Sequence, residues 1–331
     1  MSGELSGAHD APVVIVGAGP CGLAAAAAMK QAGIPALVFD AGCVASSIVG
    51  YPTYINFFST AERIAVAGLP FPLAAEKPTR RDALAYYRSV VTHFGLAVRQ
   101  YEAVESVKRA SGGFLVTSRL RGGAVRETMA RGVVIATGYF GTPNALGVAG
   151  EDLPHVTHQF REGHEAFQRT ALVVGGGNSA VETSLDLYRA GAHVTMIHFG
   201  PTFDKNIKPW VLPDFEGRVK GGDIRVIWNS RVVKIEPDIV YLGTPGGEVA
   251  LPAQHVYLMT GYTPHPGLLT SLAVAIDPVT GVPAHDPVTM ETTTKGVFIA
   301  GVLASGYDAN KIFIENGRGH GVLIATALKT A

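Results

Sequence analysis

The sequence predicts an α/β protein made of two Rossmann-like dinucleotide-binding domains, each with three layers. A glycine-rich motif occurs twice, at residues 13–22 and at residues 172–180, and each copy joins an apolar strand pattern to a helical pattern. In that context G-x-G-x-x-G or G-x-G-x-x-A binds the phosphates of a dinucleotide. The flanking turns repeat at the same offset as the glycines, so we expect two nucleotides on one chain and electron transfer between them.

The first βαβ unit is predicted over residues 11–42. Its three glycines have different tasks, because Gly17 permits the tight turn, Gly19 lets the backbone approach a pyrophosphate, and Gly22 lets the helix pack on the strand. Asp40 ends the second strand, where a carboxylate either accepts hydrogen bonds from a ribose or caps a turn. We expect the ribose role.

Three further segments follow in the first half of the chain. Residues 43–78 carry turn formers and aromatic residues without a regular pattern. Residues 79–94 have the apolar spacing of a helix that begins after a Thr79 cap. Residues 97–135 alternate apolar and polar positions, which indicates a β-meander that leads into a buried strand.

The second half repeats this layout after a linker. Residues 141–170 contain the prolines and glycines of a connecting segment, and residues 171–252 predict a second βαβ unit followed by strands. Residues 256–261 form another apolar strand that ends in Thr-Gly, like the Ala-Thr-Gly end of the earlier meander. A strand at residues 297–301 and a helix at about residues 312–328 complete the expected elements.

Composition excludes several classes of function. A chain of 331 residues with 47% hydrophobic residues is long enough for two domains with their own cores. The 27 acidic and 27 basic residues balance, so we expect no nucleic-acid partner. The polar first ten residues lack a basic region and the apolar run at residues 24–29 is too short to span a membrane, so we expect no signal peptide and no membrane partner. Two cysteines favour the cytoplasm.

The order of these elements resembles the small thioredoxin-reductase-like flavoproteins, which have two dinucleotide-binding domains. The likeness spans nearly the whole chain: the first motif, Ala-Thr-Gly, the second motif, Thr-Gly and the strand Gly-Val-Phe-Ile-Ala-Gly. In that group the NAD(P)H domain is inserted into the FAD domain. The resemblance therefore implies an FAD-binding domain at residues 1–142 and 255–331, and an NAD(P)H-binding domain at residues 143–254.

Thioredoxin reductases of this group carry a Cys-x-x-Cys, which is absent here because the two cysteines are Cys21 and Cys43. The motif Gly-Pro-Cys-Gly, together with residues 51–53, 57–59 and 307–318, resembles the bacillithiol-disulfide reductase family. That resemblance implies NADPH as electron donor, FAD as mediator and a small-molecule thiol disulfide as acceptor. We also expect a homodimer or a larger homo-oligomer.

Cys21 matches the cysteine of that family motif and is the candidate catalytic residue. The N-terminus of the predicted helix would favour its thiolate, whereas a neighbouring FAD pyrophosphate would disfavour it. Two interpretations are open: direct redox exchange with the substrate, or packing of a small side chain beside the cofactor. We expect Cys43 to be structural.

The FAD site is expected to draw on several segments. Lys311 and Ile312 fall where relatives direct main-chain N–H groups at the flavin pyrimidine. Tyr51, Phe57 and Phe58 either wall the flavin ring or lie in the core. The candidate FAD-binding residues are Gly17, Ala18, Gly19, Pro20, Cys21, Gly22, Asp40, Ala41, Ser47, Tyr51, Phe57, Val104, Ala136, Thr137, Gly138, Gly301, Lys311 and Ile312.

The second site is expected to hold NADPH. His198 occupies the position that matches Asp40, so no carboxylate stands there to repel a 2′-phosphate. The arginines that thioredoxin reductases place after this strand are missing, so either Lys205 or Lys208 meets the phosphate or both are merely solvated. The candidate NADPH-binding residues are Gly175, Gly177, Asn178, Ser179, Ala180, Glu182, His198, Lys205, Lys208, Thr260 and Gly261.

Other functions of the same fold stay open. A ferredoxin- or flavodoxin-NADP reductase also lacks Cys-x-x-Cys, and a flavin-bound redox sensor would keep nucleotide binding without turnover. A flavin monooxygenase is a third alternative, although its usual motif is not evident at residues 150–160. His155, His158 and His164 lie close in the sequence, but their spacing is loose and no cysteine or acid cluster completes a ligand set, so we expect no metal site.

Overall fold

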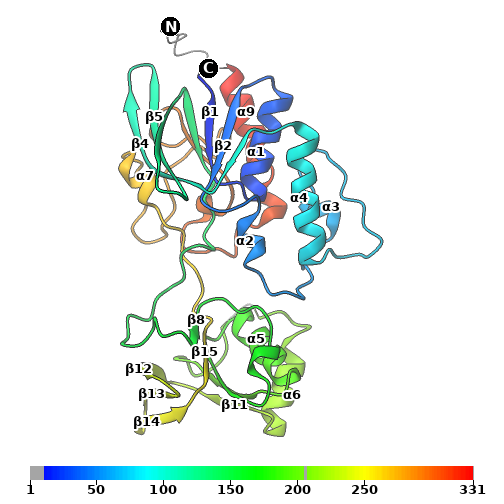
Figure 1. Cartoon of the computed structure of the whole chain (residues 1–331), viewed down its shortest axis with the longest axis vertical. Helices are drawn as coiled ribbons and strands as arrows, with labels where there is room; N and C mark the ends of the chain where they lie inside the picture. The colour runs from blue at the N-terminus through cyan, green and yellow to red at the C-terminus, as the bar shows by residue number, and fades with distance from the viewer. Residues whose placement is uncertain (1–10, 205–206, 331) are drawn as a thin grey trace. The chain divides into compact units, whose positions relative to one another are not determined.

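The computed structural model describes residues 11–204 and 207–330 and divides into two compact units (Figure 1). The first unit comprises the chain up to Val49, Ile55–Thr142 and the chain from Thr263 onward, and the second comprises Gly50–Tyr54 and Pro143–Tyr262. The boundary predicted at residue 254 is therefore too early. Strand β15 (His255–Leu258) pairs in parallel with β9 (Thr170–Val174), which keeps it in the second unit.

The first unit is built on a parallel sheet whose strand order is β16-β7-β1-β2-β3. Figure 1 shows helices α1, α4 and α9 on one side of this sheet, while the antiparallel sheet β4-β5-β6 lies on the other. The parallel strands are β1 (Val13–Val16), β2 (Ala36–Asp40), β3 (Val98–Gln100), β7 (Gly132–Ile135) and β16 (Val297–Ile299). The antiparallel strands are β4 (Glu102–Ala110), β5 (Gly113–Leu120) and β6 (Val125–Ala130). The helices are α1 (Pro20–Gln31), α2 (Ser46–Val49), α3 (Ala61–Ile64), α4 (Arg80–Phe94), α7 (Gly267–Ser271), α8 (Ile314–Gly317) and α9 (His320–Thr330), with a 3-10 turn η2 (Gly301–Ser305).

The second unit repeats this plan with the parallel order β11-β10-β9-β15-β8 and the antiparallel sheet β12-β13-β14. The parallel strands not yet given are β8 (Val156–Thr157), β10 (His193–Ile197) and β11 (Ile224–Ile227). The antiparallel strands are β12 (Arg231–Glu236), β13 (Ile239–Thr244) and β14 (Gly247–Pro252). The helices are α5 (Asn178–Arg189) and α6 (Leu212–Gly221), with a 3-10 turn η1 (His164–Ala166).

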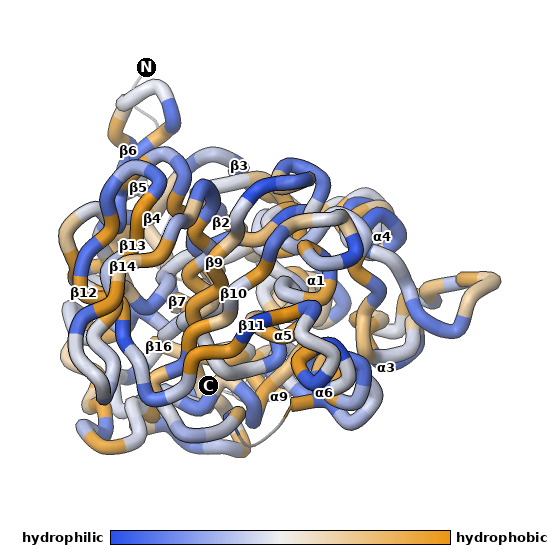
Figure 2. Tube along the Cα trace, turned by 90° about the horizontal axis from the view of Figure 1, so that it is seen from below, coloured by the Kyte–Doolittle hydropathy of each residue, from blue (hydrophilic) through white to orange (hydrophobic). Residues whose placement is uncertain are grey.

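Alternating side chains of β9 give the second unit its three layers. Val173 packs into the core that includes Leu185 of α5, whereas Leu172 and Val174 pack into a second core with Leu242 of β13. Successive residues of a strand point to opposite faces, so one apolar strand supplies both cores. Figure 2 shows the hydrophobic colouring of β9 and β10 that this double burial requires. The structure thus has the predicted α/β fold with three-layer, Rossmann-like units.

Helix α4 begins and ends where its local sequence predicts. The Thr79 side chain accepts a hydrogen bond from the amide of Asp82, and the Asp82 carboxylate accepts one from the amide of Thr79 at 2.9 Å. This reciprocal pair is a capping box, and Gly95 ends the helix in the left-handed region with φ 58°. The predicted helix at residues 79–94 is therefore confirmed.

The predicted C-terminal helix is wrong as a single element. The chain forms the short α8, turns, and then forms α9, rather than one helix over residues 312–328. Gly321 allows α9 to lie directly on α1, because a Cβ at this position would stand 2.5 Å from the Cα of Ala25. Arg318 sits in the turn and donates hydrogen bonds to the carbonyls of Glu62 (2.7 Å) and Ala65. These tertiary contacts override the local helical pattern.

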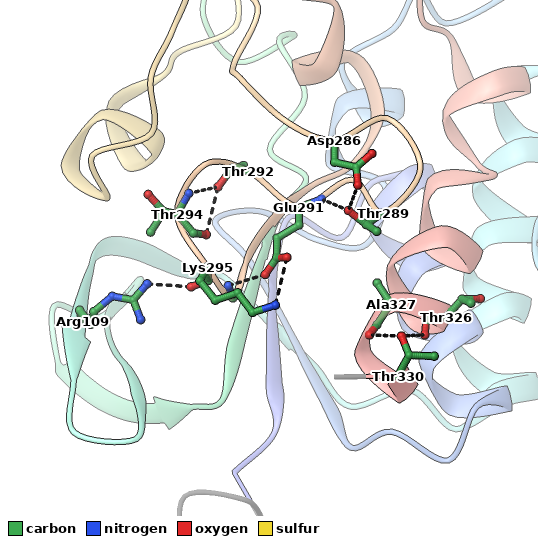
Figure 3. A network of polar contacts seen from close by, with 11 residues as sticks. Arg109, Asp286, Thr289, Glu291, Thr292, Thr294, Lys295, Thr326, Ala327 and Thr330 are labelled. Atoms are coloured by element: carbon green, nitrogen blue, oxygen red, sulfur yellow. Dashed lines mark hydrogen bonds and ion pairs between the residues drawn. The ribbon is translucent and has the colours of Figure 1, made fainter.

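A polar network holds the turn that leads into β16 (Figure 3). The Glu291 carboxylate accepts a hydrogen bond from the amide of Gly296 at 2.8 Å and pairs with Lys295 at 3.4 Å. Arg109 of β4 donates to the carbonyl of Lys295 at 2.7 Å, which ties the antiparallel sheet to this turn. The network fixes the start of β16 and hence the position of Gly301, which follows it.

Within the described ranges, no helix combines the length and apolar character needed to cross a membrane.

Candidate functional site

In the first glycine-rich turn, two glycines are packed against the backbone and the third has free space beside it. Gly17 has φ 114°, and a Cβ there would stand 2.3 Å from the carbonyl oxygen of Ala136. A Cβ on Gly22 would stand 1.9 Å from the carbonyl oxygen of Gly17, so the helix reaches the strand only without a side chain. A Cβ on Gly19 would meet nothing within 4 Å. The turn therefore has the open glycine that a pyrophosphate needs for close approach, and its residues fit a dinucleotide.

Asp40 fastens this turn from the end of β2. Its Oδ2 accepts a hydrogen bond from the amide of Ala18 at 2.7 Å, and its Oδ1 accepts from the amide of Gly42 at 2.7 Å and from the hydroxyl of Ser46 at 3.1 Å. An ionised carboxylate has about four acceptor positions, so one is left for a ribose hydroxyl. The turn-fixing role is observed, and the ribose role stays a prediction.

Cys21 lies in the first turn of α1, with its sulfur packed between two glycines. A Cβ on Gly301 would stand 3.1 Å from this sulfur and a Cβ on Gly317 would stand 3.0 Å from it. Burial raises the pKa of the Cys21 thiol to about 12. At neutral pH the side chain is therefore a thiol, because the loss of hydration outweighs the influence of the helix N-terminus.

Lys311 and Ile312 were predicted to lie at the N-terminus of a helix, but they precede it. Helix α8 begins at Ile314, and the amide of Phe313 is capped by the Asn316 side chain at 2.8 Å. Lys311 and Ile312 therefore precede the cap; Lys311 is exposed and its Nζ lies 3.8 Å from Asp308. Their main-chain contacts with a flavin stay a prediction, but a dipole of helix α8 cannot carry the effect, because the helix has four residues.

A clamp between two distant segments was not predicted. Glu315 of α8 accepts a hydrogen bond from Ser59 and pairs with Arg63 at 3.3 Å, while Arg318 binds the carbonyls at the end of α3. The partners are more than 250 residues apart in the chain, so no local pattern signals them. The clamp joins the loop that follows α2 to the tail that packs on Cys21.

The other predicted FAD residues are distributed over several elements of the first unit, with the exception of Tyr51. Ala136 is buried at the end of β7, Thr137 is exposed, and Gly138 has φ 68°. Tyr51 lies in the segment 50–54 that belongs to the second unit. Five more candidates lie in the first unit: Pro20 at the start of α1, Ala41 after β2, Ser47 in α2, Phe57 before α3 and Val104 in β4. Their contacts with FAD stay predictions.

The second glycine-rich turn repeats the first with different neighbours. Gly175 has φ 145°, and a Cβ there would stand 2.3 Å from the carbonyl oxygen of Met259. Ala180 takes the place of the third glycine and is buried against this turn. Among the described residues, a Cβ on Gly177 would meet only the carboxylate of Asp204, at 3.4 Å. This turn therefore also offers an open glycine and fits a second dinucleotide.

His198 is turned inward rather than toward the position of a phosphate. Its side chain is 3% exposed, and a Cβ on Gly176 would stand 2.3 Å from its ring. Its Nε2 lies 3.6 Å from Asp204, and its Nδ1 has no hydrogen-bond partner in the described part of the chain. His198 therefore supports the glycine turn by packing, and its contact with a 2′-phosphate stays a prediction.

Lys208 lies beside the start of α5, while Lys205 lies outside the described residues. The amide of Lys208 donates to the Asn178 side chain at 2.8 Å. Burial lowers the pKa of Lys208 to about 8, although the nearby Glu182 opposes the shift, and burial raises the pKa of Glu182. The half-buried Lys208 and Glu182 thus lie near the N-terminus of α5, where Ser179 is exposed.

Thr260 and Gly261 are held by the segment that enters the second unit. The hydroxyl of Thr260 donates to the carbonyl of Asn144 at 2.6 Å, and the amide of Asn144 donates to the carbonyl of Gly261 at 3.0 Å. Gly261 has φ 82°, a conformation that favours glycine. No group of three or more metal-binding side chains gathers anywhere in residues 11–204 and 207–330.

Comparison with known proteins places these two turns in a family. The model of the pyridine nucleotide-disulphide oxidoreductases matches residues 14–301. A curated relative, bacilliredoxin reductase Bdr of Bacillus subtilis, is 43% identical over 317 residues, which cover 95% of this chain and 96% of the relative.

Two solved structures agree over nearly the whole chain. Bacillithiol disulfide reductase Bdr (YpdA) from Bacillus cereus is 40% identical with a TM-score of 0.94, covering 97% of this chain and 99% of that one. The same enzyme from Staphylococcus aureus is 38% identical with a TM-score of 0.90, covering 97% and 98%. The chain therefore belongs to the pyridine nucleotide-disulphide oxidoreductase family, within its bacillithiol disulfide reductase group, and is a flavin- and NAD(P)H-dependent oxidoreductase.

Proposed function

We propose that this protein is an NADPH-dependent, FAD-containing reductase of a low-molecular-weight thiol disulfide such as bacillithiol disulfide. The observation that carries the proposal is the match to bacillithiol disulfide reductases over nearly the full length of both chains. The reaction converts one disulfide, NADPH and a proton into two thiols and NADP⁺. A bound flavin supplies the electron transfer, because it accepts a hydride from a nicotinamide and returns two electrons to an acceptor.

The residues of the chain bind and orient the two nucleotides. The first glycine turn, with Gly19 and Asp40, would hold FAD, and the second, with Gly177 and Asn178, would hold NADPH. The amides at each helix N-terminus supply donors for the phosphates. Two cysteines without Cys-x-x-Cys spacing leave no dithiol relay of the thioredoxin reductase type.

The half-buried Cys21 packs its sulfur between Gly301 and Gly317, and its raised pKa disfavours the thiolate. We therefore assign it a packing role beside the bound FAD. A Cys21→Ser variant tests the assignment: it should retain FAD and reduce an artificial acceptor such as ferricyanide with NADPH. Loss of disulfide reduction alone, with ferricyanide reduction intact, would assign Cys21 to the exchange with substrate instead.

Steady-state oxidation of NADPH with competing acceptors tests the proposed reaction. We expect turnover with bacillithiol disulfide that exceeds the background rate with oxygen, and no turnover with oxidised ferredoxin. Turnover that depends on ferredoxin alone would place the protein among the ferredoxin-NADP reductases. Turnover with oxygen that forms a hydroxylated product would place it among the flavin monooxygenases.

A protein acceptor is the second candidate, because the curated Bacillus subtilis relative is named a bacilliredoxin reductase. The same assay with a bacilliredoxin carrying a mixed disulfide distinguishes the two acceptors by their kcat/KM values. We further propose a cytoplasmic location and a homo-oligomeric state. Light scattering of the FAD-loaded protein measures the oligomeric state.

A further inference from the structure

An arginine from outside the glycine-rich motif lies beside the end of β10. Arg231 is the first residue of β12, and its guanidinium carbon lies 4.6 Å from the centre of the Phe199 ring. The Phe199 side chain directly follows His198 and is 58% exposed. Arg231 is itself exposed, and no carboxylate of the described residues lies within ion-pair distance of it. A cation is therefore presented to solvent on an aromatic surface.

The backbone fixes Arg231 at this place. The connection from β11 to β12 runs along the residues that follow β10, because the amide of Ser230 donates to the carbonyl of His198 and the amide of Asn229 to the carbonyl of Gly200, both at 3.0 Å. Asn229 makes the tight turn with φ 52°. On its other side Arg231 pairs with Gly243 in the antiparallel sheet. Hydrogen bonds and strand pairing thus hold the backbone of Arg231 beside residue 199, and its guanidinium lies over the Phe199 ring.

The residues that follow the second strand of a Rossmann unit recognise the 2′-position of the adenosine ribose. An arginine suits this place, because its planar guanidinium binds a phosphate through two hydrogen bonds and stacks on a flat ring. Here the chain continues from His198 as Phe-Gly-Pro-Thr-Phe-Asp, and the first cation in the sequence is Lys205. Arg231 reaches the same place from another strand.

We propose that Arg231, supported by the Phe199 ring, binds the 2′-phosphate of NADPH and so sets the preference for NADPH over NADH. The proposal rests on the proposed function, since it assumes a nicotinamide nucleotide on the second glycine turn. It replaces the expectation that a lysine of the following loop has this task. The arginine side chain is a specificity determinant and takes no part in electron transfer.

Calorimetric titration of the FAD-loaded protein tests the proposal without any turnover. Two probes differ by one phosphate: adenosine 2′,5′-bisphosphate and adenosine 5′-monophosphate. Arg231→Ala should weaken binding of the bisphosphate by about 10- to 100-fold, the effect of one charge-assisted contact, and leave the monophosphate within about twofold. Arg231→Lys should recover part of the loss. Arg169→Ala is the matched control, because it removes an exposed arginine just before β9, at the end of the sheet opposite the glycine turn.

The outcomes separate this proposal from the proposed function. If the unaltered protein binds both probes equally, the assignment of NADPH itself is wrong. If it prefers the bisphosphate and Arg231→Ala keeps that preference, the NADPH assignment stands and Arg231 is not the determinant. Retained binding of the monophosphate shows that the variant is folded. A Phe199→Leu variant, expected to lose about threefold in bisphosphate affinity, checks the support by the ring.

Discussion

The two units use one scaffold and fasten their glycine turns in different ways. Their strand orders, β3-β2-β1-β7-β16 and β11-β10-β9-β15-β8, correspond strand by strand with one difference in sequence order. Strand β16 follows the other strands of its sheet in the sequence, whereas β8 precedes the other strands of its sheet. In the first unit, the Asp40 carboxylate holds the turn by accepting a hydrogen bond from the amide of Ala18. In the second, His198 at the matched position packs its ring against Gly176. A matched sequence position therefore does not imply a matched role.

The largest expected difference between the two units follows from adding a methyl group to the first glycine turn. Gly22→Ala places a Cβ 1.9 Å from a carbonyl oxygen and should destabilise the first unit by about 3 kcal/mol or more. Gly19→Ala is the matched control, because its φ of −73° suits alanine and its Cβ would meet no atom of the described residues within 4 Å. It should fold normally and lose FAD. Urea unfolding and flavin absorbance of both variants measure this difference, and equal stability of the two would refute the assigned tasks.

A second perturbation tests the packing of His198 against the glycine turn. Gly176→Ala should lower the free energy of unfolding by about 1–3 kcal/mol, because the new Cβ would stand 2.3 Å from the imidazole ring. In Gly176→Ala/His198→Ala the clash is gone, so the double variant should be more stable than the sum of the single effects. A double-mutant cycle in urea measures this coupling. Additive effects would mean that the ring does not support the turn.

The half-buried Cys21 makes the stability of the first unit sensitive to alkaline pH. Because the pKa of Cys21 rises from about 9 to about 12 on folding, the unfolded chain releases the thiol proton first as pH increases. The free energy of unfolding should therefore fall between these pH values, and fall less steeply in Cys21→Ala. Iodoacetamide at pH 8 should label Cys43 well before Cys21. Faster labelling of Cys21 would contradict the packing of its sulfur.

The smallest expected effect concerns the acid beside the second turn. Asp204 stands near the open glycine, where a pyrophosphate would approach, so Asp204→Asn should tighten NADPH binding by about two- to fivefold at low salt. Asp238→Asn, in the exposed turn between β12 and β13, is the control and should have no effect. Weaker binding in Asp204→Asn would show that the carboxylate holds the loop rather than repelling the nucleotide.

Local sequence patterns predicted most of the fold, because residues close in the sequence determine most of its helices, strands and turns. The glycines, the strand alternation and the Thr79 cap act within a few residues of themselves, and the elements they predict are observed. The single C-terminal helix and the boundary at residue 254 were wrong, because contacts from distant segments decide both. The Arg318 clamp and the position of Arg231 depend on such contacts too, and no spacing in the sequence reveals them.

In the proposed reaction, electrons pass from NADPH through bound FAD to a disulfide. The most direct test of this reaction is anaerobic: NADPH is added to the FAD-loaded protein while the flavin absorbance is followed, and bacillithiol disulfide is added once the flavin is bleached. We predict faster bleaching with NADPH than with NADH, and full recovery of the absorbance on addition of the disulfide. A flavin that stays reduced with the disulfide and is reoxidised by ferredoxin would contradict the proposed reaction.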